Sequence, residues 1–499
     1  MKKVIVIGSG FAGLSAASFM AKAGWDVTVL EKHHTPGGRA RQLKGEGFTF
    51  DIGPSWYWMP DVFERYFNCF GKKTADYYQL KRLDPSYRVY WKDGLMDIPA
   101  DYTALKKLFE SIEPDSGSQL DRFMSEAAYK YEVGINKLVH KPGQSFTEFL
   151  DWDLVKGLFK LDVFTSMKTH IGKHFKDPRL QQLMEFPVLF LGALPKDTPA
   201  LYSLMNYADI KLGTWYPEGG MYSVVEAMFS LAKELGVKFH FDHNVSAVTI
   251  VKGAAKTVVA RNTNTEEQIT DTVFEADVVI GGADYHHVEA DLLPQEYRTY
   301  TENYWNKRVM APSCLLYYIG LNKKLDGVLH HSLFFDTDFE VHGKEIYTTE
   351  QWPSDPLFYV SASSVTDTNV APEGSENLVF LIPVAAGLQG DTEELRDAYF
   401  QKIVARFEKR TGQLIQGSII YKKSYSVSNF VEDYNSFKGN AYGLANILKQ
   451  TAVLRPSCKS IKIKNLFYTG QLTVPGPGVP PSLISGEVVS KEVIKQFGN

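Results

Sequence analysis

The residues whose types and spacing first suggest chemistry are three glycines near the N-terminus. Gly8, Gly10 and Gly13 form the pattern G-x-G-x-x-G. In such a pattern the first glycine permits a tight turn, the second lets a pyrophosphate approach backbone N–H groups, and the third brings a helix against a sheet. Glu31 follows at the distance where a carboxylate accepts hydrogen bonds from ribose hydroxyls. The pattern therefore predicts a site for NAD or FAD, because a carboxylate there disfavours the phosphorylated ribose of NADP.

A strand, a helix and a second strand must hold these groups in place. Residues 4–7 are a β-branched run, apolar residues recur at helical spacing over 14–23, and "DVTVLE" (26–31) reads as a second strand. The phosphate charge would then face the positive end of the helix dipole. This order predicts a nucleotide-binding strand–helix–strand unit.

A second candidate segment lies near the C-terminus, "TGQLTVPGPGVPPSLISGE" (469–487). Proline removes backbone donors and glycine adds chain entropy, so such a run does not lie inside a helix or strand. The apolar spacing that follows is helical, with a start near Val479. We expect a rigid loop leading into a helix whose first residues, 479–482, offer backbone donors to an anion.

Three motifs resemble those of the flavin-containing amine oxidase and carotenoid desaturase superfamily: "GGR" (37–39), "FDIGP" (50–54) and the proline–glycine loop. The resemblance implies bound FAD, with Arg39 neutralising the phosphates and Val245 meeting the adenine through its backbone. It also implies that Gly53 and Pro54 give the isoalloxazine ring a flat wall. The cofactor-binding residues predicted in this way are Gly8, Gly10, Phe11, Ala12, Gly13, Glu31, Lys32, Gly37, Gly38, Arg39, Gly53, Pro54, Val245, Asp284, Gly470, Val479 and Pro480.

The order of elements, taken with this resemblance, predicts an α/β fold: a Rossmann-like FAD-binding domain with an inserted substrate domain of mixed sheet plus helices. Residues from about 100 to 210 have amphipathic helical spacing, and residues 295–440 alternate strand-like and helical stretches. We expect a discontinuous FAD-binding domain over 1–105, 215–294 and 441–499. Residues 106–214 and 295–440 would form a substrate-binding and membrane-associating domain.

Longer stretches, among them "FTFDIGPSWYWMPDVFERYF", "GTWYPEGGM" and "TVPGPGVPPSLISG", resemble bacterial-type phytoene desaturases. The resemblance implies an FAD-dependent oxidoreductase that dehydrogenates a 40-carbon carotenoid, phytoene, stepwise toward lycopene by hydride transfer to the flavin.

The sequence has no second G-x-G-x-x-G for a nicotinamide nucleotide, so we expect oxygen or a quinone as electron acceptor. A 1-hydroxycarotenoid 3,4-desaturase of the same fold stays an alternative. An amine oxidase and a non-enzymatic isoprenoid-binding chaperone are further alternatives, the latter opposed by the intact flavin motifs.

Acid–base and metal candidates are few. By the same resemblance, Glu148 in "SFTEFLDW" aligns with an acidic position near the flavin end of the substrate channel and is the candidate proton acceptor. Relatives carry a basic residue where this chain has Asp151. The histidine pairs at 33–34, 286–287 and 330–331 are adjacent, so in strands they point to opposite faces. We therefore predict no metal site.

The composition limits the classes of binding partner and the cellular locations that we expect. The 499 residues are 44% hydrophobic and 22% charged with a net charge of −4, which gives no sign of nucleic-acid binding. Three widely spaced cysteines fit a reducing cytoplasm. The apolar run "FPVLFLGALP" (186–195) is far shorter than the roughly 20 residues that span a bilayer. Because a C40 substrate resides in lipid, we expect a cytoplasmic protein peripherally associated with the inner face of the cell membrane, with 186–195 in the docking surface or channel wall.

Overall fold

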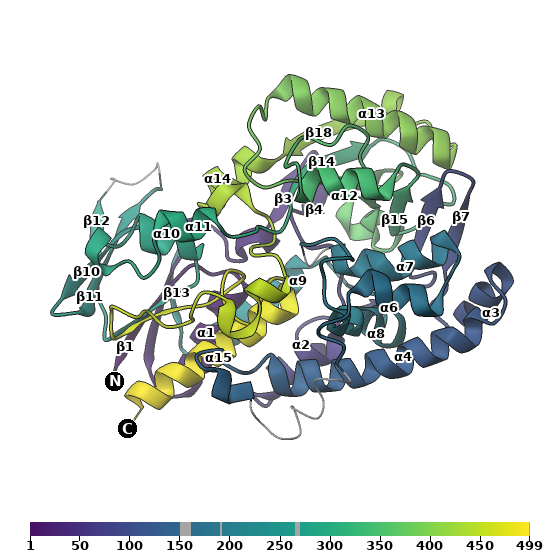
Figure 1. The fold of residues 1–499 in the computed structure, drawn as a ribbon. Coiled ribbons are helices and arrows are strands. Elements are labelled where there is room, and N and C mark those ends of the chain that lie inside the picture. Colours follow the sequence, from purple (N-terminus) through teal and green to yellow (C-terminus); the bar gives the residue numbers. More distant parts are fainter. Residues whose placement is uncertain (150–160, 190–191, 265–269, 499) are drawn as a thin grey trace.

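The computed structural model describes residues 1–149, 161–189, 192–264 and 270–498. Two large sheets organise them (Figure 1). A five-stranded sheet lies near both chain termini, and a seven-stranded sheet lies at the upper right of the view, above a layer of helices that includes α3, α4, α6, α7 and α8.

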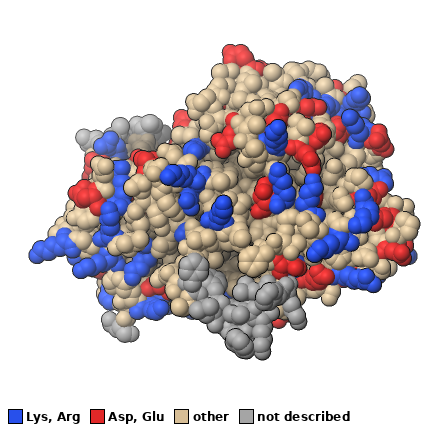
Figure 2. Space-filling model, viewed as in Figure 1, with Lys and Arg blue, Asp and Glu red and all other residues tan. Residues whose placement is uncertain are grey.

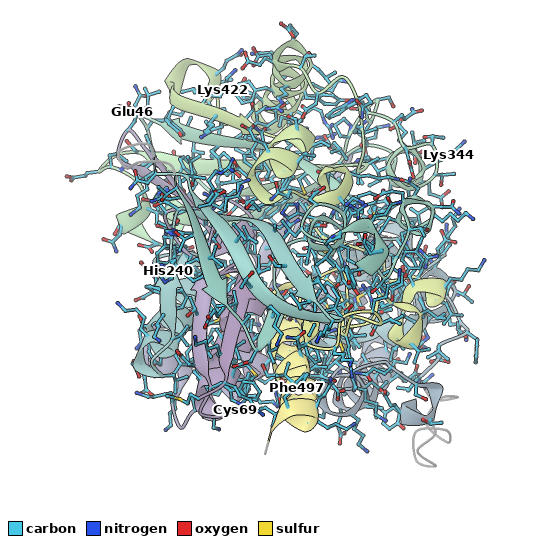
Figure 3. All side chains as sticks on the ribbon, turned by 90° about the vertical axis from the view of Figure 1, so that its left-hand side faces the viewer. Glu46, Cys69, His240, Lys344, Lys422 and Phe497 are labelled. Carbon is cyan, nitrogen blue, oxygen red and sulfur yellow. The ribbon has the colours of Figure 1, made fainter. Side chains whose placement is uncertain are left out.

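The five-stranded sheet is parallel throughout, in the order β19-β13-β1-β2-β9. Its strands are β1 (Lys3–Ile7), β2 (Asp26–Leu30), β9 (Lys238–His240), β13 (Val278–Gly281) and β19 (Leu466–Tyr468). Val4, Val6 and Val29 are fully buried, as expected where helices cover both faces of a parallel sheet. Figure 3 shows His240, the last residue of β9, beside the purple strands of this sheet.

Two helices from opposite ends of the chain pack together on this sheet. They are α1 (Phe11–Lys22), which follows the glycine loop, and α15 (Val479–Phe497), whose C-terminal Phe497 is labelled in Figure 3. A Cβ at Gly486 would lie 2.6 Å from both the Ala12 carbonyl oxygen and the Ala16 nitrogen. The absence of a side chain at Gly486 therefore lets α15 approach the backbone of α1.

The seven-stranded sheet has the order β18-β14-β17-β16-β15-β6-β7 and is antiparallel except between β15 and β6. Its strands are β6 (Tyr87–Trp91), β7 (Gly94–Ile98), β14 (Ser313–Leu321), β15 (His331–Phe335), β16 (Phe358–Ser361), β17 (Glu376–Val384) and β18 (Ile419–Tyr425). Helix α13 (Glu393–Thr411) packs Phe400, Ile403 and Phe407 against one face. The opposite face, called the inner face below, turns toward the rest of the molecule.

Smaller elements complete the fold. The remaining strands are β3 (Gln42–Gly45), β4 (Phe48–Asp51), β5 (Leu80–Arg82), β8 (Trp215–Pro217), β10 (His243–Val251), β11 (Ala254–Asn262) and β12 (Asp271–Glu275). The remaining helices include α2 (Pro60–Asn68), α3 (Tyr102–Ile112), α4 (Ser116–Val133), α6 (Met167–His174), α7 (Pro178–Leu189), α8 (Leu204–Tyr207), α9 (Tyr222–Glu234), α10 (Tyr285–Ala290), α11 (Glu302–Asn306), α12 (Phe339–Tyr347) and α14 (Val427–Tyr434).

The predicted fold class is confirmed, with a parallel nucleotide-type sheet and a mixed sheet plus helices. The division into two domains stays a prediction. Strands β6 and β7 precede the boundary expected at residue 105, yet they belong to the seven-stranded sheet. Within the described residues, no helix has both the length and the apolar character needed to cross a membrane.

Candidate active site

The glycine loop is shaped by two different constraints. A Cβ at Gly13 would lie 2.0 Å from the Gly8 carbonyl oxygen, so Gly13 allows α1 to touch the loop. A Cβ at Gly10 would meet nothing within 4 Å. Gly13 thus serves packing, and Gly10 leaves open space beside the N-terminus of α1, where a phosphate group fits.

Glu31 lies beside this loop at the end of β2. Its buried carboxylate accepts hydrogen bonds from the Ser9 backbone N–H (2.8 Å) and hydroxyl (2.6 Å), and from the His33 N–H (2.9 Å). The Glu31 carbonyl accepts from the His243 N–H at 2.8 Å, which brings β10 and the buried Val245 to the same end of the sheet. Since each carboxylate oxygen has two lone pairs, ribose hydroxyls can still donate to Glu31.

The "GGR" motif lies directly against the glycine loop. A Cβ at Gly38 would be 3.3 Å from the Gly10 Cα. The Arg39 guanidinium donates to the Ser436 hydroxyl at 2.9 Å and the Asn440 carbonyl at 3.3 Å, whereas its buried Nε has no partner among the described residues. Burial lowers the pKa of Arg39, and the Asp284 carboxylate opposes that shift. A partly desolvated cation with an unused donor suits a phosphate.

Residues 436–443, called the bridging segment below, were not identified from the sequence. Besides its contacts with Arg39, this segment donates from the Phe437 N–H to Asp284 (3.3 Å) and accepts at the Asn440 side chain from Gln471 (2.8 Å). Asp284 also caps α10, accepting from the His286 N–H at 3.0 Å. The bridging segment therefore joins the "GGR" loop to the C-terminal loop, and no sequence motif signals that role.

The C-terminal loop lies next to the glycine helix, as predicted. Gly470 adopts a φ of 109°, and a Cβ there would be 3.8 Å from the Ala12 side chain. Helix α15 begins at Val479, but Pro480 and Pro481 have no N–H and the Ser482 N–H donates to the Gly478 carbonyl. Of residues 479–482, which were expected to offer backbone donors, only Val479 therefore has an N–H that can reach a ligand.

The "FDIGP" turn connects the two sheets. The Tyr318 hydroxyl, on the inner face of β14, donates to the Ile52 carbonyl at 2.6 Å. Asp51 accepts from the Met221 N–H at 2.7 Å, at the start of α9. A Cβ at Gly53 would lie 2.4 Å from the Arg39 carbonyl oxygen, so this glycine is required by the close approach of the "GGR" loop as well as by any flat wall for a ring. Pro54 follows in the same turn.

An apolar cavity with an empty volume of about 690 Å³, part of it open to solvent, lies on the inner face of the seven-stranded sheet. Trp56, two residues beyond the "FDIGP" turn, packs against the wall of this cavity: its ring centroid is 6.0 Å from that of Phe186 and 5.6 Å from that of Tyr359, which both line the cavity. The lining residues are Phe186, Leu189, Pro312, Cys314, Leu333, Phe335, Phe339, His342, Gly343, Ile346, Tyr347, Leu357, Phe358, Tyr359, Leu381, Pro383 and Tyr442.

The cavity lining carries no charge. His342 accepts from the Leu357 N–H at its Nδ1 and therefore donates from Nε2 to the Pro383 carbonyl, each at 3.0 Å. Burial also lowers the pKa of His342 to about 4. No carboxylate, lysine or arginine lines the cavity in the described part of the chain. Such a space suits a hydrocarbon.

Two predicted site residues have other partners. Glu148 accepts hydrogen bonds from the N–H groups of residues 143, 144 and 145, at 2.9 to 3.1 Å, which holds a local turn. Its assignment as a proton acceptor stays a prediction.

The Lys32 ammonium donates to the Glu432 carbonyl, and burial lowers the pKa of Lys32. Phe11 and Ala12 are buried in the first turn of α1.

A cluster of possible metal ligands lies elsewhere, between α4 and α6. Ligand atoms of Glu126, His170 and His174 are within 4.8 Å of one another. The Lys130 ammonium is 3.4 Å from the His170 Nε2 and forms an ion pair with Asp162 at 2.9 Å. Because this buried cation would repel a metal ion, we assign no metal to the cluster.

Comparison with known proteins identifies the family. The family of flavin-containing amine oxidoreductases matches residues 11–494. The chain is 40% identical over 498 residues to a carotenoid 3,4-desaturase from Haloarcula japonica (99% of this chain, 98% of the relative). It is 30% identical to a zeta-carotene-forming phytoene desaturase from Myxococcus xanthus (99% and 94%). A putrescine oxidase structure with bound putrescine shares the fold, with a TM-score of 0.61 at 14% identity over 99% of both chains.

The geometry fits the cofactor that this family implies. Glu31 would hold the ribose, the open space at Gly10 and the unused donor of Arg39 would receive the phosphates, and Gly470 with the start of α15 would adjoin the ring system. The predictions of FAD and of an oxidoreductase acting on CH–CH bonds are confirmed by the family and by the carotenoid relatives. The chain belongs to the flavin-containing amine oxidoreductase family and, within it, to the carotenoid desaturases.

Proposed function

We propose that this protein is a carotenoid 3,4-desaturase, which removes two hydrogens from the C3–C4 link near the end of a C40 chain. The observation that carries a carotenoid substrate is the uncharged cavity, whose wall contacts the ring of Trp56, two residues beyond the "FDIGP" turn. FAD supplies the hydride acceptor when bound. The greater identity to a carotenoid 3,4-desaturase than to a phytoene desaturase, 40% against 30%, supports 3,4-desaturation over our first expectation of phytoene.

The residues that line the cavity position the polyene and exclude water from it, and they supply no strong acid or base. Phe186, Phe335 and Leu381 exclude water from the polyene. A carbocation that forms when hydride leaves is stabilised by the neighbouring double bonds, so the adjacent proton can be lost to a weak base.

Dehydrogenation of phytoene to lycopene is the second candidate. The apolar lining favours it, because phytoene has hydrocarbon ends. The 30% identity to a phytoene desaturase over 99% of this chain also supports it.

Product analysis separates the two functions. Purified protein with FAD is mixed with liposomes that carry either a 1-hydroxycarotenoid saturated at C3–C4 or phytoene. We expect the hydroxylated substrate to lose two hydrogens by mass and to absorb at longer wavelength. Coloured products from phytoene, with the hydroxylated carotenoid left unchanged, would overturn 3,4-desaturation in favour of the second candidate.

We also propose peripheral docking on the inner face of the cell membrane, with oxygen or a quinone as acceptor. A C40 substrate must arrive from lipid, and Phe164 exposes 85% of its surface. On the face in Figure 2, acidic and basic side chains are interspersed around uncharged surface. Burial of apolar side chains, at about 25 cal/mol per Å², would supply the affinity. In a flotation experiment, the protein should rise with the liposomes. Recovery of all the protein in the unbound fraction would contradict docking.

A further inference from the structure

The inner face of the seven-stranded sheet changes polarity along its strands. Residues paired across antiparallel strands lie on the same face and form rows. One row contains His331, Ser361, Val379 and Tyr318, and the next contains Leu333, Tyr359, Leu381 and Leu316. A third row has Pro383 paired with Cys314, and Phe335 lies on the same side of β15. The face is thus polar in the first row and apolar in the third.

The polar row lies at the end of the sheet that contacts the "FDIGP" turn. Tyr318 of this row donates to Ile52, the residue before Gly53. A second, smaller pocket lies here, with an empty volume of about 260 Å³, part of it open to solvent. Its lining residues are Asp51, Ser55, Tyr216, His330, Ser361, Ser363 and Val379. This polar pocket therefore adjoins the turn that is expected to face the flavin.

Tyr359 connects the polar pocket to the apolar cavity. It lines the apolar cavity, and its hydroxyl lies 2.6 Å from the His331 Nδ1 and interacts with the Ser55 and Ser361 side chains, which line the polar pocket. His331 is fully buried and stacks on Trp56 with ring centroids 4.1 Å apart. Its Nε2 has no partner among the described residues. Tyr359, Ser55, Ser361 and His331 therefore form one hydrogen-bonded network, and its serine hydroxyls line the polar pocket.

We propose that the polar pocket binds the hydroxyl group at the end of a carotenoid substrate. The inference rests on the proposed function. It assigns the recognition of the end group to Ser361, which lines the pocket, and to the Tyr359 hydroxyl, which interacts with Ser361 and is held by His331. The oxygen of a C1 hydroxyl is three bonds from C3, so a hydroxyl site beside the "FDIGP" turn places the C3–C4 link next to that turn. The remaining polyene then extends along Leu333 and Leu381 into the apolar cavity.

The test uses two carotenoids of equal length, one with a C1 hydroxyl and one without. Binding to the FAD-loaded protein is measured by quenching of tryptophan fluorescence, and turnover by product formation. Tyr359→Phe and Ser361→Ala should each reduce the preference for the hydroxylated ligand about tenfold, the size of one lost hydrogen bond in a buried site. Binding of the ligand without hydroxyl should change little.

A matched control and two contrary outcomes complete the test. Tyr317→Phe removes a hydroxyl from the opposite face of the same sheet, where it donates to the Arg396 carbonyl, and should leave the preference intact. An unchanged preference in both test variants would overturn the hydroxyl site, even if the wild type makes the 3,4-desaturated product. Conversely, loss of preference without such a product in the wild type would support the site and reject the proposed function. If the Tyr359→Phe variant does not retain FAD, the preference of the Ser361→Ala variant for the hydroxylated ligand decides whether the site exists.

Discussion

The two sheets build their sites in different ways. The site beside the parallel sheet is built from backbone: Gly13 and Gly38 let chain segments approach closely, and Gly10 leaves open space that phosphates would occupy. The seven-stranded sheet uses side chains that meet through strand pairing, such as Leu333, Tyr359 and Leu381 from three separate strands. A site made of backbone turns depends on a few local residues, whereas a site made of cross-strand rows depends on register. The following variants test that contrast.

The largest effect is expected at Glu31. Glu31→Lys would place a cation among the Ser9 and His33 donors, where ribose hydroxyls also need an acceptor. We expect loss of bound FAD, measured as flavin absorbance per protein after gel filtration. Glu31→Gln, which keeps one acceptor oxygen, should retain part of it. Full flavin occupancy in Glu31→Lys would contradict the assignment.

Two glycines of the same loop should separate folding from cofactor binding. Gly13→Ala forces a Cβ to within 2.0 Å of the Gly8 carbonyl oxygen and should reduce the free energy of unfolding by about 3 kcal/mol. Gly10→Ala meets open space, so the apoprotein should melt at the wild-type temperature but bind FAD more weakly. Gly172→Ala, also without contacts within 4 Å, serves as the control. Equal effects of the two loop variants on apoprotein stability would refute this division of roles.

On the seven-stranded sheet, Leu381→Asn should impair substrate and spare the flavin. An amide without partners in the apolar cavity costs about 2 kcal/mol, which corresponds to a loss of carotenoid turnover on the order of thirtyfold if the substrate must cover it. Flavin absorbance should remain at the wild-type level. Coupled loss of flavin and turnover would mean that the two regions are not separable.

Acid should weaken the contact between α2 and α15. Glu487 is buried, which raises its pKa, but hydrogen bonds from Arg65 (2.7 and 2.8 Å) and Lys491 outweigh burial and lower the pKa to about 2. The stabilisation is therefore present above the unfolded value of about 4.3 and is lost as the pH falls toward 2. Glu487→Gln should cost about 1 kcal/mol at neutral pH, since Arg65 is 40% exposed. Denaturation at several pH values should show the difference vanish in acid.

The smallest effect is expected for Glu148→Gln. Its carboxylate holds three N–H groups of one turn, so the variant should lose about 1 kcal/mol of stability and retain turnover within a few fold. A loss of turnover by several orders of magnitude, with flavin retained, would instead support the role as proton acceptor.

The contrast between the sheets also explains what the sequence could predict. The strand–helix–strand unit, the role of Gly13 and the start of α15 at Val479 follow from local spacing and turn chemistry. The bridging segment and the rows of the inner face depend on contacts between residues far apart in the chain, such as Arg39 with Asn440 and Ser361 with Val379. The sequence itself excludes Pro480 and Pro481 as donors, because proline has no N–H.

The central claim is that one continuous site joins the flavin to an uncharged carotenoid cavity. It is tested most directly by mixing the FAD-loaded protein with a 1-hydroxycarotenoid in liposomes, without oxygen, quinone or nicotinamide nucleotide. The account predicts that the oxidised-flavin absorbance disappears while one equivalent of the carotenoid gains a double bond at C3–C4. Unchanged flavin absorbance with both the hydroxylated carotenoid and phytoene, in protein that retains full FAD, would contradict it.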